Sequence, residues 1–299
     1  MTDPAIKEQF IQTMEKFMGL ACVRLPDDVY SRLSELRANE DAPMQRVIYD
    51  SYFDNLKKAE DLKRPCCQDT GLLHFYIKAG TSFPYLDIIS CSLGEAVHRA
   101  TRSVPLRPNT VNYFEERNTN DNTAERIPWI NWDLVPEGEE LEITTYFAGG
   151  GCCLPGKSQV FKPSDGYAAI IQQAFDAVTG YGINACTPLI VGIGLGHNIE
   201  NAAMLSKKAY LRPLGTRHPH PRGAELERRI LEGLNSLGIG AQGLRGNQVA
   251  MAVHIESSGR HTATIASAVN TSCYVHRRGI IRFKKDMSYE MPTYKGAAL

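Results

Sequence analysis

The stretch between Asp176 and Glu200 most constrains the fold, because it contains no Asp, Glu, Lys or Arg. A segment of this length without charge is either a membrane span or part of a protein interior. It also contains five glycines, together with Asn184, Pro188 and Asn198, and this composition disfavours a transmembrane helix. We therefore predict a buried strand and loop here, and no membrane segment.

The other apolar patterns predict a mixed α/β fold with a helical beginning. Helical spacing of apolar residues covers most of the first 60 residues, with expected helices around Ile6–Phe17, after Pro26 and over Pro43–Asp61. Later helices are expected at Leu93–Ser103, Asp165–Val178, Ile199–Ala209 and Ala224–Leu237. Strands are expected at Leu72–Ile77, Leu141–Phe147, Leu189–Ile193, Val249–Ile255 and Thr262–Val269. These patterns predict a helical N-terminal segment followed by mixed β-sheets covered by helices over residues 1–299, in one large domain or two intimate ones.

Composition excludes some partners. The 299 residues are 43% hydrophobic, which is enough to bury a substantial core. Lys and Arg together number 33, as do Asp and Glu, so the formal charge is zero. A neutral chain gives no electrostatic reason to expect nucleic acid or a membrane surface as a partner. No apolar signal-peptide core follows Met1, so we expect a cytoplasmic protein.

Eight cysteines are present, and in a cytoplasmic protein an even number does not imply disulfides. The sequence has no C-x-x-C pair, which disfavours zinc-ribbon and ferredoxin-type sites. Cys67, Cys186 and Cys273 instead lie singly in polar, turn-like segments. Three scattered thiolates suit an iron–sulfur cubane with one iron left open. By spacing alone, however, buried and inert thiols are the better interpretation.

Two glycine-rich segments resemble nucleotide-binding motifs. Gly151–Ser158 fits the pattern G-x-x-x-x-G-K-[ST], but the residues after Ser158 look extended and Pro163 follows, where a P-loop requires a helix. A nucleotide-dependent ATPase therefore remains only a rival hypothesis, and backbone binding of another small anion is preferred. Gly192-Ile-Gly-Leu-Gly196 lacks the full dinucleotide spacing, and a strand-to-helix turn explains it without a cofactor.

Two other side chains are candidates for chemistry. His254 interrupts a strand-like apolar run, where a buried polar group needs a partner. Arg107 lies in a proline-flanked loop from which it could clamp a carboxylate, although an ordinary surface arginine would look the same.

Four segments in order resemble class I fumarases and their relatives, from about residue 10 to the end of the chain. These segments are Arg64-Pro-Cys-Cys-Gln-Asp-Thr-Gly71, Ala148–Gly151, Asn184–Pro188 and Leu237–Leu244. More narrowly, Gly149–Ser158 and Cys273–Gly279 resemble the α subunits of the tartrate-dehydrating branch of that family.

The resemblance implies a 4Fe–4S cluster held by Cys67, Cys186 and Cys273, with Cys66 as a neighbour that could confuse the assignment. The fourth iron would have no protein ligand, would bind the substrate and would make the cluster sensitive to oxygen. Asp69 and His254 are the implied catalytic residues. The implied substrate-binding residues are Gln68, Arg107, Gly149, Cys152, Lys157 and Ser158.

The implied reaction is the dehydration of L(+)-tartrate, a small dicarboxylate, to oxaloacetate and water. The alternative is the α subunit of a two-subunit fumarase that interconverts malate and fumarate. In single-chain members of the family a second domain completes the site, so we expect a separate β subunit and an α2β2 heterotetramer. A cluster-binding scaffold without activity is a further alternative.

Overall fold

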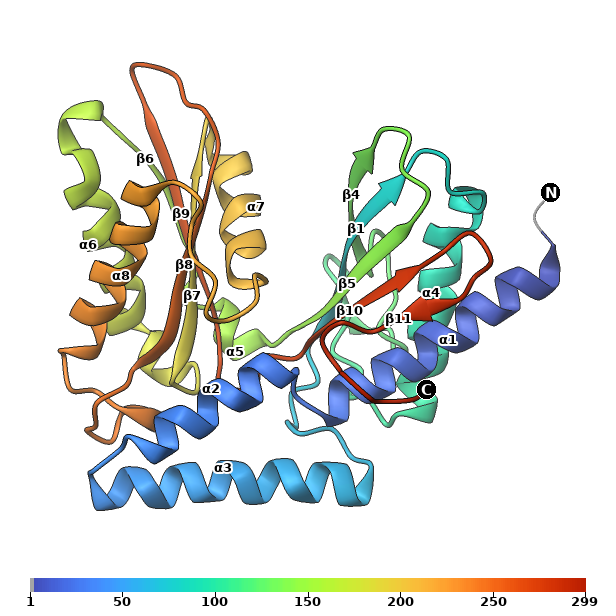
Figure 1. The fold of residues 1–299 in the computed structure, drawn as a ribbon, viewed down its shortest axis with the longest axis horizontal. Coiled ribbons are helices and arrows are strands. Elements are labelled where there is room, and N and C mark those ends of the chain that lie inside the picture. The colour runs from blue at the N-terminus through green and yellow to red at the C-terminus, as the bar shows by residue number, and fades with distance from the viewer. Residues whose placement is uncertain (1–2) are drawn as a thin grey trace. The chain divides into compact units, whose positions relative to one another are not determined.

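A computed structural model describes residues 3–299, which form two compact units. Unit 1 comprises residues 3–27, 54–149 and 277–299, and unit 2 comprises residues 28–53 and 150–276. The chain is a mixture of helices and mixed β-sheets that begins with three helices, so the predicted fold class is confirmed (Figure 1).

The three N-terminal helices are α1 (Pro4–Val23), α2 (Asp27–Ala38) and α3 (Pro43–Leu62). Asp3 caps α1 by accepting a hydrogen bond of 2.8 Å from the amide of Ala5. The apolar stripe that predicted this helix is fully buried at Phe10, Met14 and Phe17. In α3, residues 43–53 belong to unit 2 and the remaining residues belong to unit 1.

Unit 1 is built on a five-stranded sheet in the order β11-β10-β5-β1-β4. Its strands are β1 (Leu72–Gly80), β4 (Trp129–Val135), β5 (Leu141–Ala148), β10 (Arg278–Phe283) and β11 (Tyr289–Glu290). β1 is parallel to β4 and antiparallel to β5. Helices α1 and α4 (Leu86–Ser103) supply the other half of the core, and a small hairpin pairs β2 (Val111–Asn112) with β3 (Arg117–Asn118).

Unit 2 contains a four-stranded sheet in the order β6-β9-β7-β8. Its strands are β6 (Lys157–Phe161), β7 (Leu189–Gly196), β8 (Ala250–Ser257) and β9 (Ile265–Ser272). Helices α6 (Gly166–Gly180) and α8 (Pro221–Asn235) cover one face, and α7 (Ile199–Tyr210) covers the other (Figure 1). Short elements complete the unit: α5 (Gly150–Cys153) and the 3₁₀ turns η1 (Pro163–Asp165), η2 (Gly182–Asn184) and η3 (Ala241–Gly243).

The alternate glycines of β7 let α7 pack directly on the strand. A Cβ atom on Gly192 would lie 2.1 Å from the carbonyl oxygen of Ser206, and one on Gly194 would lie 1.9 Å from that of Ala202. Any side chain at these positions would displace the helix. The Gly-x-Gly-x-Gly pattern lies within β7, where it serves helix–sheet packing, and not in the strand-to-helix turn that the sequence analysis expected.

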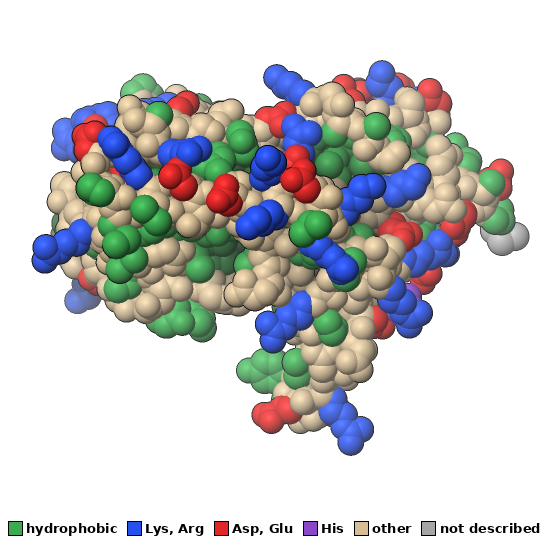
Figure 2. Space-filling model, turned by 90° about the horizontal axis from the view of Figure 1, so that it is seen from below, with side chains coloured by type: hydrophobic (Ala, Val, Ile, Leu, Met, Phe, Trp, Pro, Cys, Tyr) green, Lys and Arg blue, Asp and Glu red, His purple; other side chains and the backbone are tan. Residues whose placement is uncertain are grey.

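The uncharged segment is a buried strand and loop, as predicted, because β7 is almost entirely buried. Within residues 3–299, no helix is long and apolar enough to span a membrane. The segment after Ser158 is extended, as β6, and the preceding α5 is a single turn, so the helix that a P-loop requires is missing from this part of the described chain. Basic and acidic side chains are interspersed on the face shown in Figure 2, in keeping with the neutral net charge.

Candidate functional site

Cys66 and Cys67, adjacent in sequence, have different surroundings in unit 1. Cys66 is 3% exposed, and its thiol donates to the carbonyl oxygen of Cys22 at 3.2 Å. Burial raises the pKa of the Cys66 thiol to about 12, against a weaker opposite effect of Arg277. Cys67 is partly exposed, and its thiol faces the Gln68 amide oxygen at 3.9 Å. A thiolate forms more readily on an exposed sulfur than on a buried one, so Cys67 suits a ligand role better than Cys66.

Asp69 lies in a tight turn directly after these cysteines. Its Oδ1 accepts hydrogen bonds from the Gly71 amide at 2.9 Å and from the Asn109 side-chain amide at 3.1 Å. Gly71 has a φ of +78°, and a Cβ there would lie 2.9 Å from the Ala148 backbone, so only glycine fits the turn. These contacts fix the direction of a half-buried carboxylate, as an acid/base group requires.

Arg277, which directly precedes β10, contacts this turn and was not singled out by the sequence analysis. Its side chain is 2% exposed, its guanidinium lies 5.6 Å from the centre of the Phe147 ring, and its Nη2 donates to the carbonyl oxygen of Asp69 at 2.7 Å. A buried arginine is rare unless it is held by such contacts. The sequence contains one indication of its importance, which is its position four residues after the predicted ligand Cys273.

Cys186 and Cys273 lie in neighbouring loops of unit 2. Cys186 precedes β7 and Cys273 follows β9, which is antiparallel to β7, so both lie at the same end of the sheet. The amide of Tyr274 donates to the carbonyl oxygen of Cys186 at 3.2 Å. Cys186 is exposed and adopts a φ of +57°, a conformation that a residue with a side chain holds only when its surroundings impose it.

Aromatic and amide side chains surround these two loops. The ring of Tyr52 stacks on that of Tyr274 at 3.6 Å, and its hydroxyl donates to the carbonyl oxygen of Thr187 at 2.9 Å. Gln242 donates to the same hydroxyl at 2.7 Å. Burial raises the pKa of Tyr52 above that of a free phenol, so its hydroxyl stays protonated and able to donate well above neutral pH.

The loop from Gly150 to Gly156 packs against β9 within unit 2. The carbonyl oxygen of Cys152 accepts a hydrogen bond from Thr271 at 2.7 Å, and a Cβ on Gly156 would lie 2.9 Å from the Asn270 amide oxygen. Lys157 and Ser158 follow as exposed residues at the start of β6. The preceding Gly149 is buried and belongs to unit 1.

The remaining predicted residues are divided between the units. Gln68 and Arg107 are exposed in unit 1, and the carbonyl oxygen of Arg107 accepts from Thr70 at 3.2 Å. His254 is 2% exposed on β8 of unit 2, beside Gly192 of β7. It lines a pocket of about 380 Å³ together with α2 residues that include Asp28 and Arg32.

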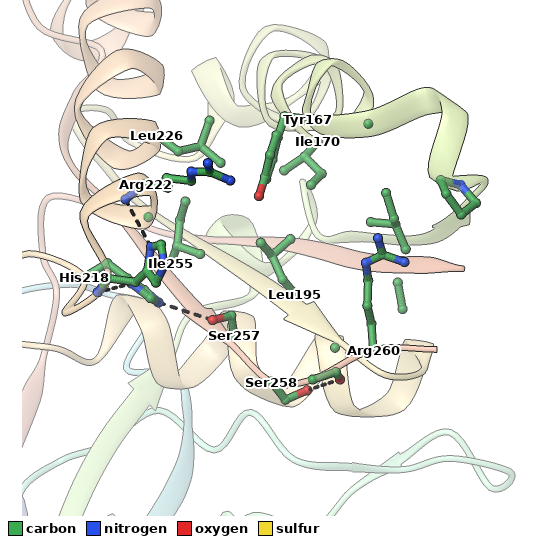
Figure 3. A pocket seen from close by; sticks show the side chains of 18 residues that line it. Tyr167, Ile170, Leu195, His218, Arg222, Leu226, Ile255, Ser257, Ser258 and Arg260 are labelled. Atoms are coloured by element: carbon green, nitrogen blue, oxygen red, sulfur yellow. Dashed lines mark hydrogen bonds between the residues drawn. The ribbon is translucent and has the colours of Figure 1, made fainter. Parts of the chain in front are cut away.

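A pocket of about 560 Å³ lies at the other end of the unit 2 sheet, where β7 and β8 end (Figure 3). Tyr167 of α6, Leu226 of α8 and Leu195 of β7 line it. Its polar lining includes Arg222 and Arg260. None of the predicted site residues lines this pocket, so it is separate from the predicted site.

The three predicted cluster ligands therefore come from both units, Cys67 from unit 1 and the other two from unit 2. Among residues 3–299, no group of three or more His, Cys, Asp or Glu side chains is close enough to hold a metal ion. The donor chemistry nevertheless fits an iron–sulfur group. Cys67, Cys186 and Cys273 are all at least partly exposed, whereas Cys22 and Cys66 are buried with pKa values raised by burial.

The sequence is similar to one protein family and to proteins that carry nearly the same name in bacteria and in a Methanocaldococcus species. The sequence pattern of a family described as "Fumarate hydratase (Fumerase)" matches residues 11–282. A protein of Escherichia coli UTI89 named "L(+)-tartrate dehydratase subunit alpha" is 47% identical over 96% of this chain and 95% of its own length. The protein of the same name in Escherichia coli K12 is 46% identical over the same shares. A Methanocaldococcus jannaschii protein named "Putative L(+)-tartrate dehydratase subunit alpha" is 36% identical over 89% of this chain and 94% of its length.

Proposed function

Because the chain belongs to the fumarate hydratase (Fumerase) family of hydro-lyases, we propose that it is the larger subunit of an iron–sulfur enzyme that dehydrates L(+)-tartrate to oxaloacetate. The observation that carries the substrate is the 46–47% identity, over nearly the full length of both chains, to bacterial proteins named for that activity. We further propose that both units act together as one hydro-lyase domain, and that the protein is cytoplasmic.

The proposed cluster is a 4Fe–4S group ligated by Cys67, Cys186 and Cys273. Support for Cys67 over Cys66 comes from their different burial and from the high pKa of the Cys66 thiol. The backbone hydrogen bond from Tyr274 to Cys186 joins the two loops that carry the other proposed ligands, Cys186 and Cys273. When bound, such a cluster would supply a Lewis-acid iron for the departing hydroxyl oxygen.

The polar residues of the chain would bind the diacid and move protons. We assign acid/base roles to Asp69 and His254, because Asp69 is held in one direction by two donors and His254 is buried at a pocket that charged residues of α2 also line. Arg107 would clamp a substrate carboxylate, with Gln68 beside it. Gly149, Cys152, Lys157 and Ser158 would bind the rest of the substrate from the glycine-rich loop.

In this reaction one hydrogen leaves a carbon of tartrate as a proton and the hydroxyl leaves the neighbouring carbon. The resulting enol tautomerises to oxaloacetate, so atoms and charge balance without a redox partner. The relatives are named as α subunits, and this supports a separate β subunit here. We propose an α2β2 assembly in which β-subunit residues complete the site.

The second candidate is a malate–fumarate hydratase, which the description of the matching family favours. The two substrates differ by one hydroxyl group, and a site that hydrogen-bonds this hydroxyl can discriminate strongly against the diacid that lacks it. The test is the anaerobic kcat/KM of the chain, co-expressed with its small subunit, on L(+)-tartrate and on malate. A preference for tartrate supports the proposal, whereas a preference for malate moves the enzyme to the fumarases.

A further inference from the structure

The segment Leu237–Leu244 is a glycine-rich motif that the proposed reaction does not use. In unit 2 it forms a turn at η3, where Gly240 has a φ of +73° and Gln242 a φ of +53°. A Cβ on Gly240 would lie 2.5 Å from the amide nitrogen of Gly246, so the turn closes tightly on itself. Such a turn holds the side chain of Gln242 in a defined direction.

The turn is fixed to the first half of α3. Gln45, which is fully buried, accepts a hydrogen bond from the Ala241 amide at 2.7 Å and donates to the Ala241 carbonyl oxygen at 3.1 Å. Two turns of helix later, Tyr52 receives the hydrogen bond from Gln242. Two points of attachment therefore keep the turn in one position relative to the Tyr52 hydroxyl.

Both cysteine loops are joined to this assembly. Tyr52 donates to the carbonyl oxygen of Thr187, the residue after Cys186, and stacks on Tyr274, the residue after Cys273. The Thr187 hydroxyl in turn donates to the carbonyl oxygen of Gly240 at 2.8 Å. Cys186 adopts a left-handed backbone conformation. The next residue, Thr187, is held by Tyr52 of α3 and by Gly240, which directly precedes η3.

We propose that Tyr52 and Gln242 are positioning residues that hold the Cys186 and Cys273 loops in the arrangement that retains the iron–sulfur group. This inference rests on the proposed function, because it assumes that these two cysteines are ligands. Neither Tyr52 nor Gln242 is a ligand or a substrate-binding residue. Tyr52 acts through the Thr187 carbonyl and the Tyr274 ring, each next to a proposed ligand, and Gln242 acts through the Tyr52 hydroxyl.

The experiment uses the αβ complex, reconstituted anaerobically with iron and sulfide. Tyr52→Phe keeps the stacked ring and removes the hydroxyl, and Gln242→Met keeps the side-chain length and removes the donor. Tyr49→Phe is the matched control, because Tyr49 is buried three residues earlier in α3 and, among the described residues, its hydroxyl has no hydrogen-bond partner. The measured quantity is the rate at which an iron chelator removes the visible absorbance of the group, well below the unfolding temperature of each variant.

We expect Gln242→Met to lose iron about fivefold faster than wild type, the effect of one lost hydrogen bond, and Tyr52→Phe to lose it faster still, because its hydroxyl makes two hydrogen bonds. The double variant should be little faster than Tyr52→Phe alone, because both changes act through one hydroxyl. Tyr49→Phe should match wild type. If wild type retains iron but both variants release it at the wild-type rate, the positioning inference is wrong. If wild type takes up no iron, the proposed function fails and the inference fails with it.

Discussion

The Nη2 atom of Arg277 donates a hydrogen bond of 2.7 Å to the backbone carbonyl oxygen of Asp69. Through this bond a buried arginine near the C-terminus holds the turn that carries the proposed acid/base residue. The other side of the turn is held by Asn109, so Asp69 is restrained through both its backbone and its carboxylate. Precise orientation of such a group is what proton transfer requires.

Substitution of Arg277 should therefore lower turnover more than substrate binding. We expect Arg277→Lys to reduce kcat on the order of 10- to 100-fold, as for the loss of a charge-assisted hydrogen bond, with a smaller change in KM. Steady-state kinetics of the αβ complex measures both. Arg102→Lys, at an exposed position of α4, is the control and should leave both unchanged. An unchanged kcat in Arg277→Lys would show that the turn does not depend on this arginine.

The two adjacent cysteines of unit 1 provide a second prediction. Cys67→Ser should abolish iron binding, whereas Cys66→Ser should retain it, since Cys66 is buried and its thiol bonds to the Cys22 carbonyl. Iron analysis after reconstitution distinguishes the two. Loss of iron in Cys66→Ser with retention in Cys67→Ser would reverse the ligand assignment.

The same pair predicts a pH dependence in the cluster-free protein. Only the thiolate reacts with an alkylating agent, and burial raises the pKa of the Cys66 thiol to about 12. A raised pKa means less thiolate at neutral pH, so alkylation of Cys66 should stay slow and increase only as the pH approaches 12. Mass spectrometry of protein labelled at several pH values measures the rate. Labelling of Cys66 as fast as that of Cys67 at pH 7 would contradict the burial described above.

Packing of α7 on β7 gives a prediction about stability. Gly194→Ala should destabilise unit 2 by about 3 kcal/mol or more, because its Cβ would lie 1.9 Å from the Ala202 carbonyl oxygen. Gly180→Ala, which meets no atom within 4 Å at the end of α6, is the control and should cost little. Denaturant unfolding monitored by circular dichroism compares them. Equal stability of the two variants would show that α7 can move away from the strand.

The glycine-rich loop gives a prediction that separates the hydro-lyase from the ATPase hypothesis. Lys157→Gln should raise KM for the diacid, and ATP with Mg²⁺ should not stabilise the wild-type protein against heat, because an extended strand follows Lys157. A thermal shift measured with and without nucleotide tests this. Saturable stabilisation by ATP that is lost in Lys157→Gln would favour nucleotide binding.

Most elements of the fold follow from the apolar pattern of the sequence. The helices α3, α6, α7 and α8 and the strands β1, β5, β7, β8 and β9 lie within a few residues of the predicted ranges, whereas α1 continues past the predicted Phe17 to Val23. Helix α4 begins earlier than expected, at Leu86, because Ser90, Cys91 and Ser92 obscure the stripe that continues back to the buried Ile88 and Ile89. β4 was not predicted, since it is largely exposed on both faces of an edge strand and shows no clear alternation.

The proposed site was less accessible to sequence reasoning, because its residues act through contacts distant in the chain. Arg277 lies 208 positions after Asp69, and Tyr52 lies 190 positions before Gln242. No local pattern connects such pairs. The cysteine spacing alone favoured inert thiols, and only the resemblance to a family indicated which three of the eight would bind iron.

The most direct test of the central claim is the iron and acid-labile sulfide content of the anaerobically reconstituted αβ complex, measured for wild type and for Cys67→Ser, Cys186→Ser and Cys273→Ser. We expect about four iron and four sulfide per chain in wild type, loss of the cluster in each serine variant, and hydro-lyase activity that falls together with it. A wild type without iron, or a serine variant that keeps a full cluster and full activity, would contradict the three-cysteine assignment.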